Sequence, residues 1–232
     1  MRRWISESSV ITITPKHKRE RNGADLETTI FPFDVILSDV GGVLLTNGWD
    51  TVERAIVLEQ FGLNRAEFES RHQEHYRAWE LGAIPMKTYL DATVFYEKRD
   101  FSADDFFAAM CAQSKFLPDG ALGILQEISA SDKCMVGALN NEARETNDFR
   151  FDNFGLRELF KVALTSCNLG LRKPDAAIYQ VALMILDKSA ERILFIDDRP
   201  ENVDGAVAAG MKGIRFEGAE ALRRELTSLN VF

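Results

Sequence analysis

The residues of this 232-residue chain that are best suited to chemistry are three aspartates and one lysine. Asp39 follows a short apolar run, Asp197 and Asp198 follow a later one, and Lys173 lies between them along the chain. Carboxylate oxygens are the ligands that Mg²⁺ prefers, and a lysine neutralises both a phosphate group and crowded acids. If the fold brings these side chains together, they can bind Mg²⁺ and a phosphate at one site.

Short apolar runs that end in such polar residues predict the strands of a buried parallel sheet. The expected strands are residues 33–37, 134–139, 162–165, 193–196 and 213–216, and the expected helices between them are 122–128, 174–186, 203–209 and 219–229. This alternation predicts a doubly wound, Rossmann-like α/β fold, in which the carboxyl ends of the strands share one rim. That rim should also hold Asn140, Asn141 and Ser166, which follow two further strands.

The segment between the first two strands has a helical pattern and no strand pattern. We therefore expect residues 49–115 to form a small helical cap inserted into the α/β core, which then consists of residues 33–48 and 116–232. Residues 1–32 are polar and show no sustained period, so we expect a disordered N-terminal extension. A short amphipathic targeting peptide is the alternative for this stretch.

Composition excludes several classes of function. The formal net charge is −8 and the pI is about 5.1, whereas a broad nucleic-acid or anionic-membrane surface favours basic residues. The three cysteines contain no CxxC pair, which is typical of a protein in a reducing compartment. No apolar run approaches the roughly 18 residues of a membrane span. We expect a cytoplasmic protein whose partner is a small phosphorylated metabolite rather than a nucleic acid or a membrane.

Four motifs resemble those of the haloacid dehalogenase-like hydrolases. They are Ser38-Asp39-Val40-Gly41-Gly42-Val43-Leu44, Ala138-Leu139-Asn140-Asn141, Leu169-Gly170-Leu171-Arg172-Lys173-Pro174-Asp175 with Ile178-Tyr179, and Phe195-Ile196-Asp197-Asp198-Arg199-Pro200-Glu201-Asn202. Their order and spacing extend the resemblance over residues 34–216, nearly everything past the N-terminal extension. The nearest branch contains α-glucose-1-phosphate phosphatases and the N-terminal phosphatase domain of soluble epoxide hydrolase. The resemblance implies a Mg²⁺-dependent phosphohydrolase that acts on a small phosphomonoester such as a sugar phosphate.

The resemblance also implies roles for individual residues. Asp39 would attack phosphorus and form an aspartyl-phosphate, and Lys173 would hold Asp39 and the phosphoryl group in place. Asn140 and Asn141 would bind the phosphate with neighbouring backbone N–H groups. The metal ligands would be the carboxylates of Asp39 and Asp198 and the backbone carbonyl of Gly41, with Asp197 acting through water.

Two residues depart from the pattern of the family. Asn140 stands where the second motif normally has Ser or Thr, and Gly41 stands where most phosphatases of the family have a second aspartate. That aspartate protonates the leaving oxygen, and such assistance is worth roughly 10²–10⁴-fold in rate. Three readings follow: water or substrate replaces the acid, the substrate has a good leaving group, or the protein is nearly inactive. His72 and His75 on one cap helix could supply the acid, although two solvent-exposed helix residues are the simpler interpretation.

Three other classes of protein share parts of this pattern. A haloacid dehalogenase has a tyrosine at the position of Gly41 and needs no metal, so the pair Asp197 and Asp198 argues against it. In a two-component receiver domain the acidic pair would precede the phosphorylated aspartate. A catalytically silent binding protein is the non-enzyme alternative, because of Gly41 and the unusual Ser38.

Overall fold

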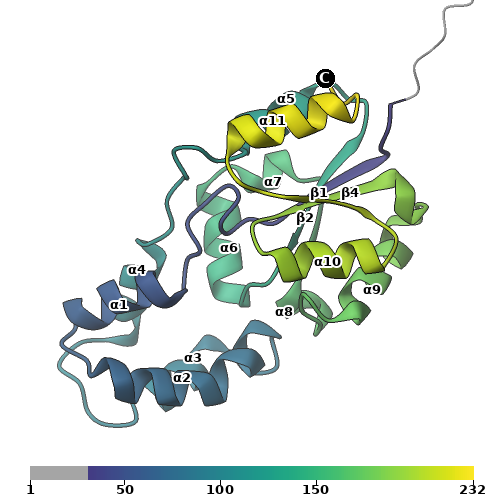
Figure 1. The fold of residues 1–232 in the computed structure, drawn as a ribbon. Coiled ribbons are helices and arrows are strands. Elements are labelled where there is room, and N and C mark those ends of the chain that lie inside the picture. Colours follow the sequence, from purple (N-terminus) through teal and green to yellow (C-terminus); the bar gives the residue numbers. More distant parts are fainter. Residues whose placement is uncertain (1–30) are drawn as a thin grey trace, which may run out of the picture. The chain divides into compact units, whose positions relative to one another are not determined.

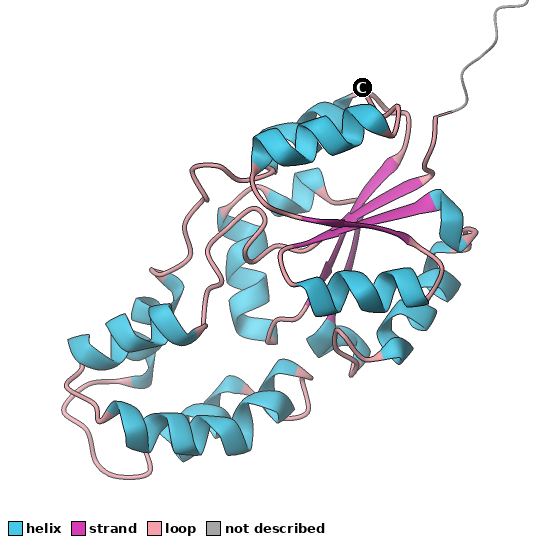
Figure 2. Ribbon diagram, viewed as in Figure 1, coloured by secondary structure: helices cyan, strands magenta, loops and turns pink. Residues whose placement is uncertain are grey.

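The computed structural model describes residues 31–232, so most of the predicted N-terminal extension, 1–32, lies outside the described residues. Within them, five strands form one parallel sheet in the order β3-β2-β1-β4-β5. Figure 2 shows the sheet in magenta with helices around it. The strands are β1 (Val35–Ser38), β2 (Met135–Asn140), β3 (Val162–Thr165), β4 (Ile193–Asp197) and β5 (Lys212–Arg215). The expectation of a doubly wound parallel α/β sheet is confirmed.

Helices cover both faces of this sheet (Figure 1). One face is covered by α5 (Leu122–Ala130), α6 (Arg144–Asn153), α7 (Leu156–Leu159) and α11 (Ala219–Ser228), and the other by α9 (Ala176–Leu186) and α10 (Pro200–Ala208). Strand β1 serves both faces, because Ile36 belongs to the first apolar cluster while Val35 and Leu37 belong to the second. This alternation follows from the two-residue period of a strand, and it explains why β1 is apolar along its length.

Sequence reasoning did not predict three helices of the core. These are α6, α7 and the short α8 (Ser166–Leu169); a 3-10 turn at Ala190–Arg192 also precedes β4. Helix α6 has the sequence RETNDFRFDN, in which an apolar stripe is hard to see. It is nevertheless half-buried, because Thr146, Asn147 and Arg150 turn polar side chains inward toward the rim of the sheet. The periodicity of apolar residues therefore could not reveal it.

The predicted cap segment, residues 49–115, contains four helices among the described residues. They are α1 (Thr51–Gln60), α2 (Arg65–Glu80), α3 (Met86–Thr93) and α4 (Ala103–Cys111), and we refer to residues 49–115 as the cap. A separate cluster that includes Phe68, Trp79, Tyr89 and Phe106 forms its apolar interior. Polar caps define the helix ends: Asn64 accepts from Glu67 N, and Ser102 and Asp105 form a capping box. None of the helices within residues 31–232 has the length and apolar composition needed to cross a membrane.

Candidate active site

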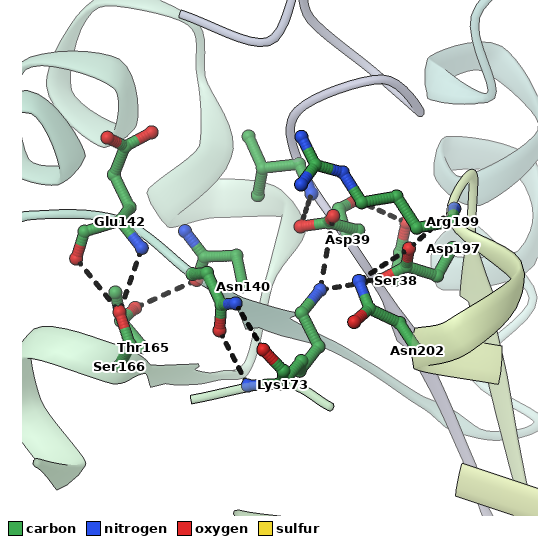
Figure 3. Close-up of polar contacts among 12 residues, drawn as sticks. Ser38, Asp39, Asn140, Glu142, Thr165, Ser166, Lys173, Asp197, Arg199 and Asn202 are labelled. Atoms are coloured by element: carbon green, nitrogen blue, oxygen red, sulfur yellow. Dashed lines mark hydrogen bonds and ion pairs between the residues drawn. The ribbon is translucent and has the colours of Figure 1, made fainter. Parts of the chain in front are cut away.

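The three acids and the lysine predicted from the sequence meet at the carboxyl ends of β1 and β4. Figure 3 shows Asp39, Lys173 and Asp197 of this cluster. Lys173 Nζ lies 3.1 Å from Asp39 Oδ2 and 2.6 Å from Asp197 Oδ2. Asp39, Asp197 and Asp198 each offer a carboxylate oxygen within 4.8 Å of the others. Because adjacent strands β1 and β4 end side by side, the register of the sheet itself produces this cluster.

Asp197 is the anchor of Lys173. Its side chain is fully buried and accepts a hydrogen bond from Lys173 Nζ. Asn202 Nδ2 donates to both of its oxygens, at 3.0 Å to Oδ1 and 3.1 Å to Oδ2. The backbone N–H of Arg199 also donates to it at 2.9 Å. A buried carboxylate with this many partners has little capacity left for a metal ion. The expected role of Asp197 as a metal ligand through water stays a prediction.

The buried charges of the site shift its pKa values. Burial raises the pKa of Asp39 to about 7, the charge of Asp197 adds to this, and the attraction of Lys173 opposes it. Burial alone would lower the pKa of Lys173, but the neighbouring carboxylates of Asp39 and Asp197 outweigh it and raise that pKa. The cluster carries more negative charge than one lysine can balance, so a bound cation would favour the ionised form of Asp39.

Asp198 has the free oxygen that a cation site requires. Its Oδ1 is buried and has no hydrogen-bond partner among residues 31–232, and burial, followed by the charge of Asp197, raises its pKa. Gly42 lies against this carboxylate: a Cβ there would come within 2.3 Å of Asp198 Oδ2, and the φ of Gly42 is +72°. Only glycine meets both demands. The carbonyl of Gly41 accepts no hydrogen bond within the described range, so Asp39, Asp198 and Gly41 fit a Mg²⁺ ion.

The two asparagines of the second motif are placed by different contacts. The side chain of Asn141 forms two hydrogen bonds with the backbone of Lys173. Its Nδ2 donates to the Lys173 carbonyl at 2.8 Å, and its Oδ1 accepts from the Lys173 N–H at 2.9 Å. Asn140 is buried, donates to Asn147 Oδ1 at 3.1 Å and accepts from Thr165 Oγ1 at 2.9 Å. Both asparagines line the cavity described below. Asn141 thus fixes the position of Lys173, a role that sequence reasoning did not assign.

The surroundings of Gly41 contain a buried arginine. A Cβ at Gly41 would lie 3.2 Å from Asn47 Oδ1 and 3.5 Å from Arg150 Nη1. Arg150 comes from α6 and is 3% exposed at its side chain; it bonds to Glu142 Oε2 at 2.9 Å and to the carbonyl of Thr46. The place into which the acid of the family would point is therefore lined by a guanidinium group and an amide.

The site opens into a cavity of about 340 Å³ between the core and the cap. Its core wall includes Asp39, Lys173 and Asn141, and its cap wall includes Trp49, His72, Tyr76 and Trp79. Polar contacts join the two walls: Asp50 at the start of α1 pairs with Arg199 at 2.8 Å, and Ser166 Oγ donates to the carbonyl of Glu80 at 2.9 Å. A volume of this size is typical of small-molecule sites.

Glu80 and Arg172 face each other across the same boundary. Arg172 Nε lies 3.2 Å from Glu80 Oε2, but the geometry makes no hydrogen bond, and both buried atoms lack such a partner among residues 31–232. Burial raises the pKa of Glu80, although Arg172 opposes the rise. Both residues line the cavity, where a polar group of a ligand can satisfy them.

The cap histidines differ from each other. His72 is 5% exposed and lines the cavity, whereas His75 is only partly buried and is absent from its lining. The interpretation of both as solvent-exposed helix residues is therefore wrong for His72. Burial lowers the pKa of His72 to about 4, so its ring is neutral near pH 7. A neutral ring cannot act as the imidazolium acid that would replace the missing aspartate.

Sequence reasoning missed several residues that shape the site. Asn202 was part of the fourth motif without a role, and Arg150 and Glu142 received none. Asn202 could have been found, because a polar residue five positions after Asp197 and one turn into a helix can reach back to the strand end. No local signal identifies Arg150, since it depends on how α6 packs against the loop at Thr46.

Comparison with known proteins identifies the family. The haloacid dehalogenase-like hydrolase family matches residues 33–210 of this chain. The chain belongs to the haloacid dehalogenase-like hydrolases. It is 29% identical over 194 residues to flavin mononucleotide hydrolase 1 of Arabidopsis thaliana, covering 82% of this chain and 78% of that protein. It is 27% identical to the sesquiterpene phosphatase astK of Aspergillus oryzae, covering 85% of this chain and 96% of that one.

Solved structures show the same fold. A haloacid dehalogenase family enzyme from Bacteroides thetaiotaomicron superposes with a TM-score of 0.69 at 20% identity, covering 80% of this hydrolase and 94% of that enzyme. Another structure of the same enzyme, with a TM-score of 0.66, 19% identity and coverage of 80% and 95%, is a complex with magnesium and inorganic phosphate. The predicted membership of this family and the predicted hydrolase class are confirmed, and the predicted magnesium cofactor has its precedent within the family.

Proposed function

We propose that this hydrolase is a Mg²⁺-dependent phosphatase that cleaves a small phosphomonoester through an aspartyl-phosphate at Asp39. The observation that carries the proposal is the contact of Asp39 with Lys173, 3.1 Å apart, on a rim that opens into a cavity. The same rim holds Asp198 Oδ1, which has no hydrogen-bond partner among residues 31–232. The relatives named as a flavin mononucleotide hydrolase and a sesquiterpene phosphatase support the same chemistry.

The acids of the site divide the work of binding the cation. Asp39, Asp198 and the carbonyl of Gly41 would hold Mg²⁺, and Asp197 would support them by keeping Lys173 in place. When bound, the ion supplies positive charge that polarises the phosphoryl oxygens. Lys173, which is buried and paired with Asp39 Oδ2, supplies a second positive charge.

The first chemical step forms a bond between a carboxylate oxygen of Asp39 and phosphorus while the bond from phosphorus to the leaving oxygen breaks. The backbone N–H of Val40 donates to Asp39 Oδ1 at 2.8 Å and Lys173 holds Oδ2, so the carboxylate is oriented before substrate binds. The leaving oxygen departs with the electron pair and takes its proton from water or from the substrate, because Gly41 offers none. Water then attacks phosphorus while the bond between phosphorus and the Asp39 oxygen breaks. The proton that water loses passes to the released phosphate or to solvent, and the carboxylate of Asp39 is restored.

Backbone N–H groups of the rim are the donors best placed for the phosphate. Those of Gly41 and Asn141 make no hydrogen bond within the described part of the chain. The remaining N–H of the Asn140 amide adds a third donor beside them, since its other contacts use one hydrogen and the oxygen. We therefore keep Asn140 and Asn141 as phosphate-binding residues, with backbone groups carrying part of that role.

The leaving group lies toward the cap, residues 49–115. The two named relatives act on phosphates with large and chemically different leaving groups, a flavin chain and a terpene. A cavity bounded by the cap can admit a leaving group of such size, and it can also admit the smaller leaving group of a sugar phosphate.

The free cysteines Cys111, Cys134 and Cys167 agree with a reducing compartment, and we propose the cytoplasm.

The test is turnover of p-nitrophenyl phosphate and acetyl phosphate with and without Mg²⁺. These substrates need little protonation of the leaving oxygen, so the missing acid at Gly41 does not limit them. We expect Mg²⁺-dependent release of phosphate that is lost when the metal is chelated. Complete inactivity toward both would favour a catalytically silent binding protein.

A further inference from the structure

The cap wall of the cavity contains a buried chain of three hydrogen-bonding groups. Trp49 Nε1 donates to Tyr89 Oη at 2.9 Å, and Tyr89 Oη lies 2.8 Å from His72 Nδ1. Tyr89 is completely buried, and its ring stacks on Trp79 at 4.3 Å. The imidazole of His72 is itself stacked on Tyr76 and Phe68. The position and orientation of the His72 ring are therefore fixed from several sides.

The direction of each hydrogen bond in this chain follows from the groups involved. The indole N–H of Trp49 can only donate, so Tyr89 Oη is its acceptor. The hydrogen of the Tyr89 hydroxyl then needs an acceptor, because a buried donor without one is costly. Within residues 31–232, His72 Nδ1 is the acceptor at hydrogen-bond distance from this hydroxyl, at 2.8 Å. Nδ1 must therefore be unprotonated, and the proton of the neutral ring sits on Nε2.

The ring is also held uncharged. Burial lowers the pKa of His72 to about 4, with the charge of Arg54 adding to this and those of Glu69 and Asp50 opposing it. Tyr89 cannot stabilise a charged ring without giving up its own acceptor. Near neutral pH, His72 thus carries a single N–H, at Nε2.

That N–H opens on the cavity. Nε2 makes no hydrogen bond within residues 31–232, and protein atoms do not enclose it completely. Since His72 lines the cavity and Nδ1 is occupied, Nε2 is the polar atom of the ring that a bound molecule can reach. We propose that His72 is a specificity-determining residue, a fixed and uncharged Nε2–H donor that binds an acceptor atom of the substrate's leaving group.

This inference rests on the proposed function, because it takes the phosphoryl group to lie against Asp39 and Lys173 on the core wall. The leaving group then extends toward the cap, where aromatic side chains of Trp49, Tyr76 and Trp79 line the cavity. A donor placed among apolar rings favours a leaving group with an acceptor oxygen or nitrogen and disfavours a pure hydrocarbon of equal size. The cap should accordingly prefer a flavin or sugar phosphate to a terpenyl phosphate.

The tautomer can be measured without any substrate. In ¹⁵N-labelled protein, long-range ¹H–¹⁵N NMR should show His72 with a protonated Nε2 and an unprotonated Nδ1 between pH 6 and 8. Tyr89→Phe removes the hydroxyl hydrogen, so its His72 ring should gain the Nδ1–H form. A charged ring, or an Nδ1–H tautomer in the unsubstituted protein, would overturn the proposal even if the enzyme proved to be an active phosphatase.

Selectivity is tested by competition against p-nitrophenyl phosphate hydrolysis. The competitors are flavin mononucleotide and farnesyl phosphate, two phosphates of primary alcohols that differ in whether the leaving group has acceptor atoms. His72→Phe should weaken inhibition by flavin mononucleotide by about 5- to 100-fold, as expected for an acceptor left unpaired in a closed site. Inhibition by farnesyl phosphate should stay within about twofold of that in the unsubstituted enzyme, because its hydrocarbon chain makes no hydrogen bond that the substitution could remove.

Matched variants separate this role from a structural one. His72→Gln keeps an N–H donor of similar reach and should restore most of the flavin mononucleotide affinity, and His75→Phe, on the same helix but outside the cavity, should change neither inhibitor. Equal weakening of both inhibitors in His72→Phe, or failure of flavin mononucleotide to compete in the unsubstituted enzyme, would overturn the proposal. A protein that does not hydrolyse p-nitrophenyl phosphate would contradict the proposed function instead, and the NMR measurement would still decide the tautomer.

Discussion

The two walls of the cavity are built on different principles. On the core wall, charged groups stand at strand ends, and Asp39, Lys173 and Asp197 satisfy one another at 2.6 to 3.1 Å. On the cap wall, the groups stand on helix faces and are mostly neutral, with the chain from Trp49 through Tyr89 to His72 as its ordered part. The difference indicates that the core performs the chemistry while the cap distinguishes one leaving group from another.

The same contrast extends to how tightly each wall is fixed. On the core wall, Lys173 and Asp197 are buried, and hydrogen bonds from Asn141 and Asn202 hold them in place. The cap meets the core through separate polar contacts, and one of them, the pair of Asp50 with Arg199, has partly exposed side chains. Exposed ion pairs are worth little, about 0–1 kcal/mol each. Changes on the core wall should therefore have large effects, and changes at the boundary with the cap smaller ones.

The largest effect should come from Asp39→Asn. The amide is nearly isosteric but a poor nucleophile and a weak metal ligand, so phosphohydrolysis should fall by about 10³-fold or more. The fold should remain intact, because burial destabilises this carboxylate and asparagine keeps an oxygen that can accept from the Val40 N–H, so the main interaction weakened is that with Lys173. Steady-state kinetics and circular dichroism would check this, and retention of more than about a tenth of the activity would contradict the role of Asp39.

The paired acids of the fourth motif should respond in opposite ways. Asp197→Ala leaves buried Lys173 with one partner fewer, and breaking such a pair costs about 3–5 kcal/mol of unfolding free energy. Asp198→Ala removes an unpartnered oxygen whose pKa is raised by burial, so stability without metal should change little. It should instead abolish the rise in melting temperature that Mg²⁺ produces.

Denaturant unfolding without metal and thermal unfolding with added Mg²⁺ distinguish the two variants. Similar losses of stability in both, or a normal Mg²⁺ response in Asp198→Ala, would show that the two acids do not divide their roles in this way.

An acid placed at Gly41 should restore little. The wild-type rate should depend steeply on the pKa of the leaving group, with phenyl and acyl phosphates cleaved far better than alkyl phosphates. An acid that donates freely is worth roughly 10²–10⁴-fold, but the carboxylate of Gly41→Asp would lie beside Arg150 Nη1 and crowd Asn47. We expect a gain of less than about tenfold on alkyl phosphates, since a carboxylate paired with arginine is a weak acid catalyst.

Gly41→Asn is the control of equal size without an acid, and rates for both variants are compared across one series of leaving groups. A gain of about 100-fold that is specific to Gly41→Asp and to alkyl phosphates would mean that Arg150 does not capture the new carboxylate.

The smallest effect should come from the contact between the cap and the core at Gly82. A Cβ at this position would lie 2.3 Å from the carbonyl oxygen of Cys167, whereas one at Gly62 would meet nothing within 4 Å. Both glycines have a positive φ, of +69° and +61°, so alanine strains the backbone at either site. Gly82→Ala should lower kcat/KM by a few-fold beyond Gly62→Ala, and equal values for the two would show that the contact is not needed for activity.

The sequence predicted the core wall and the fold to a large extent. Asp39, Lys173, Asp197 and Asp198 could be placed together because parallel strands end on one rim, which local apolar runs reveal. The five strands were expected within one or two residues of where they lie.

The cap wall and the loop at Gly41 could not be predicted in the same way. The burial of His72 depends on Tyr89, 17 residues away on another helix, and the place of Arg150 depends on a loop 104 residues away. Helix α6 was missed because its inward residues are polar. Where a side chain owes its position to packing between helices, the spacing of residue types carries no signal of it.

The central claim is that the phosphoryl group is transferred to Asp39. The most direct measurement is a search for the phosphorylated protein during turnover. The enzyme is mixed with Mg²⁺ and p-nitrophenyl phosphate, quenched in acid within milliseconds, digested and examined by mass spectrometry. The account predicts a phosphoryl group on the peptide that contains Asp39, present during turnover, absent after the substrate is exhausted and absent in Asp39→Asn. Release of phosphate with no phosphorylated peptide, or with the phosphoryl group on a different residue, would contradict it.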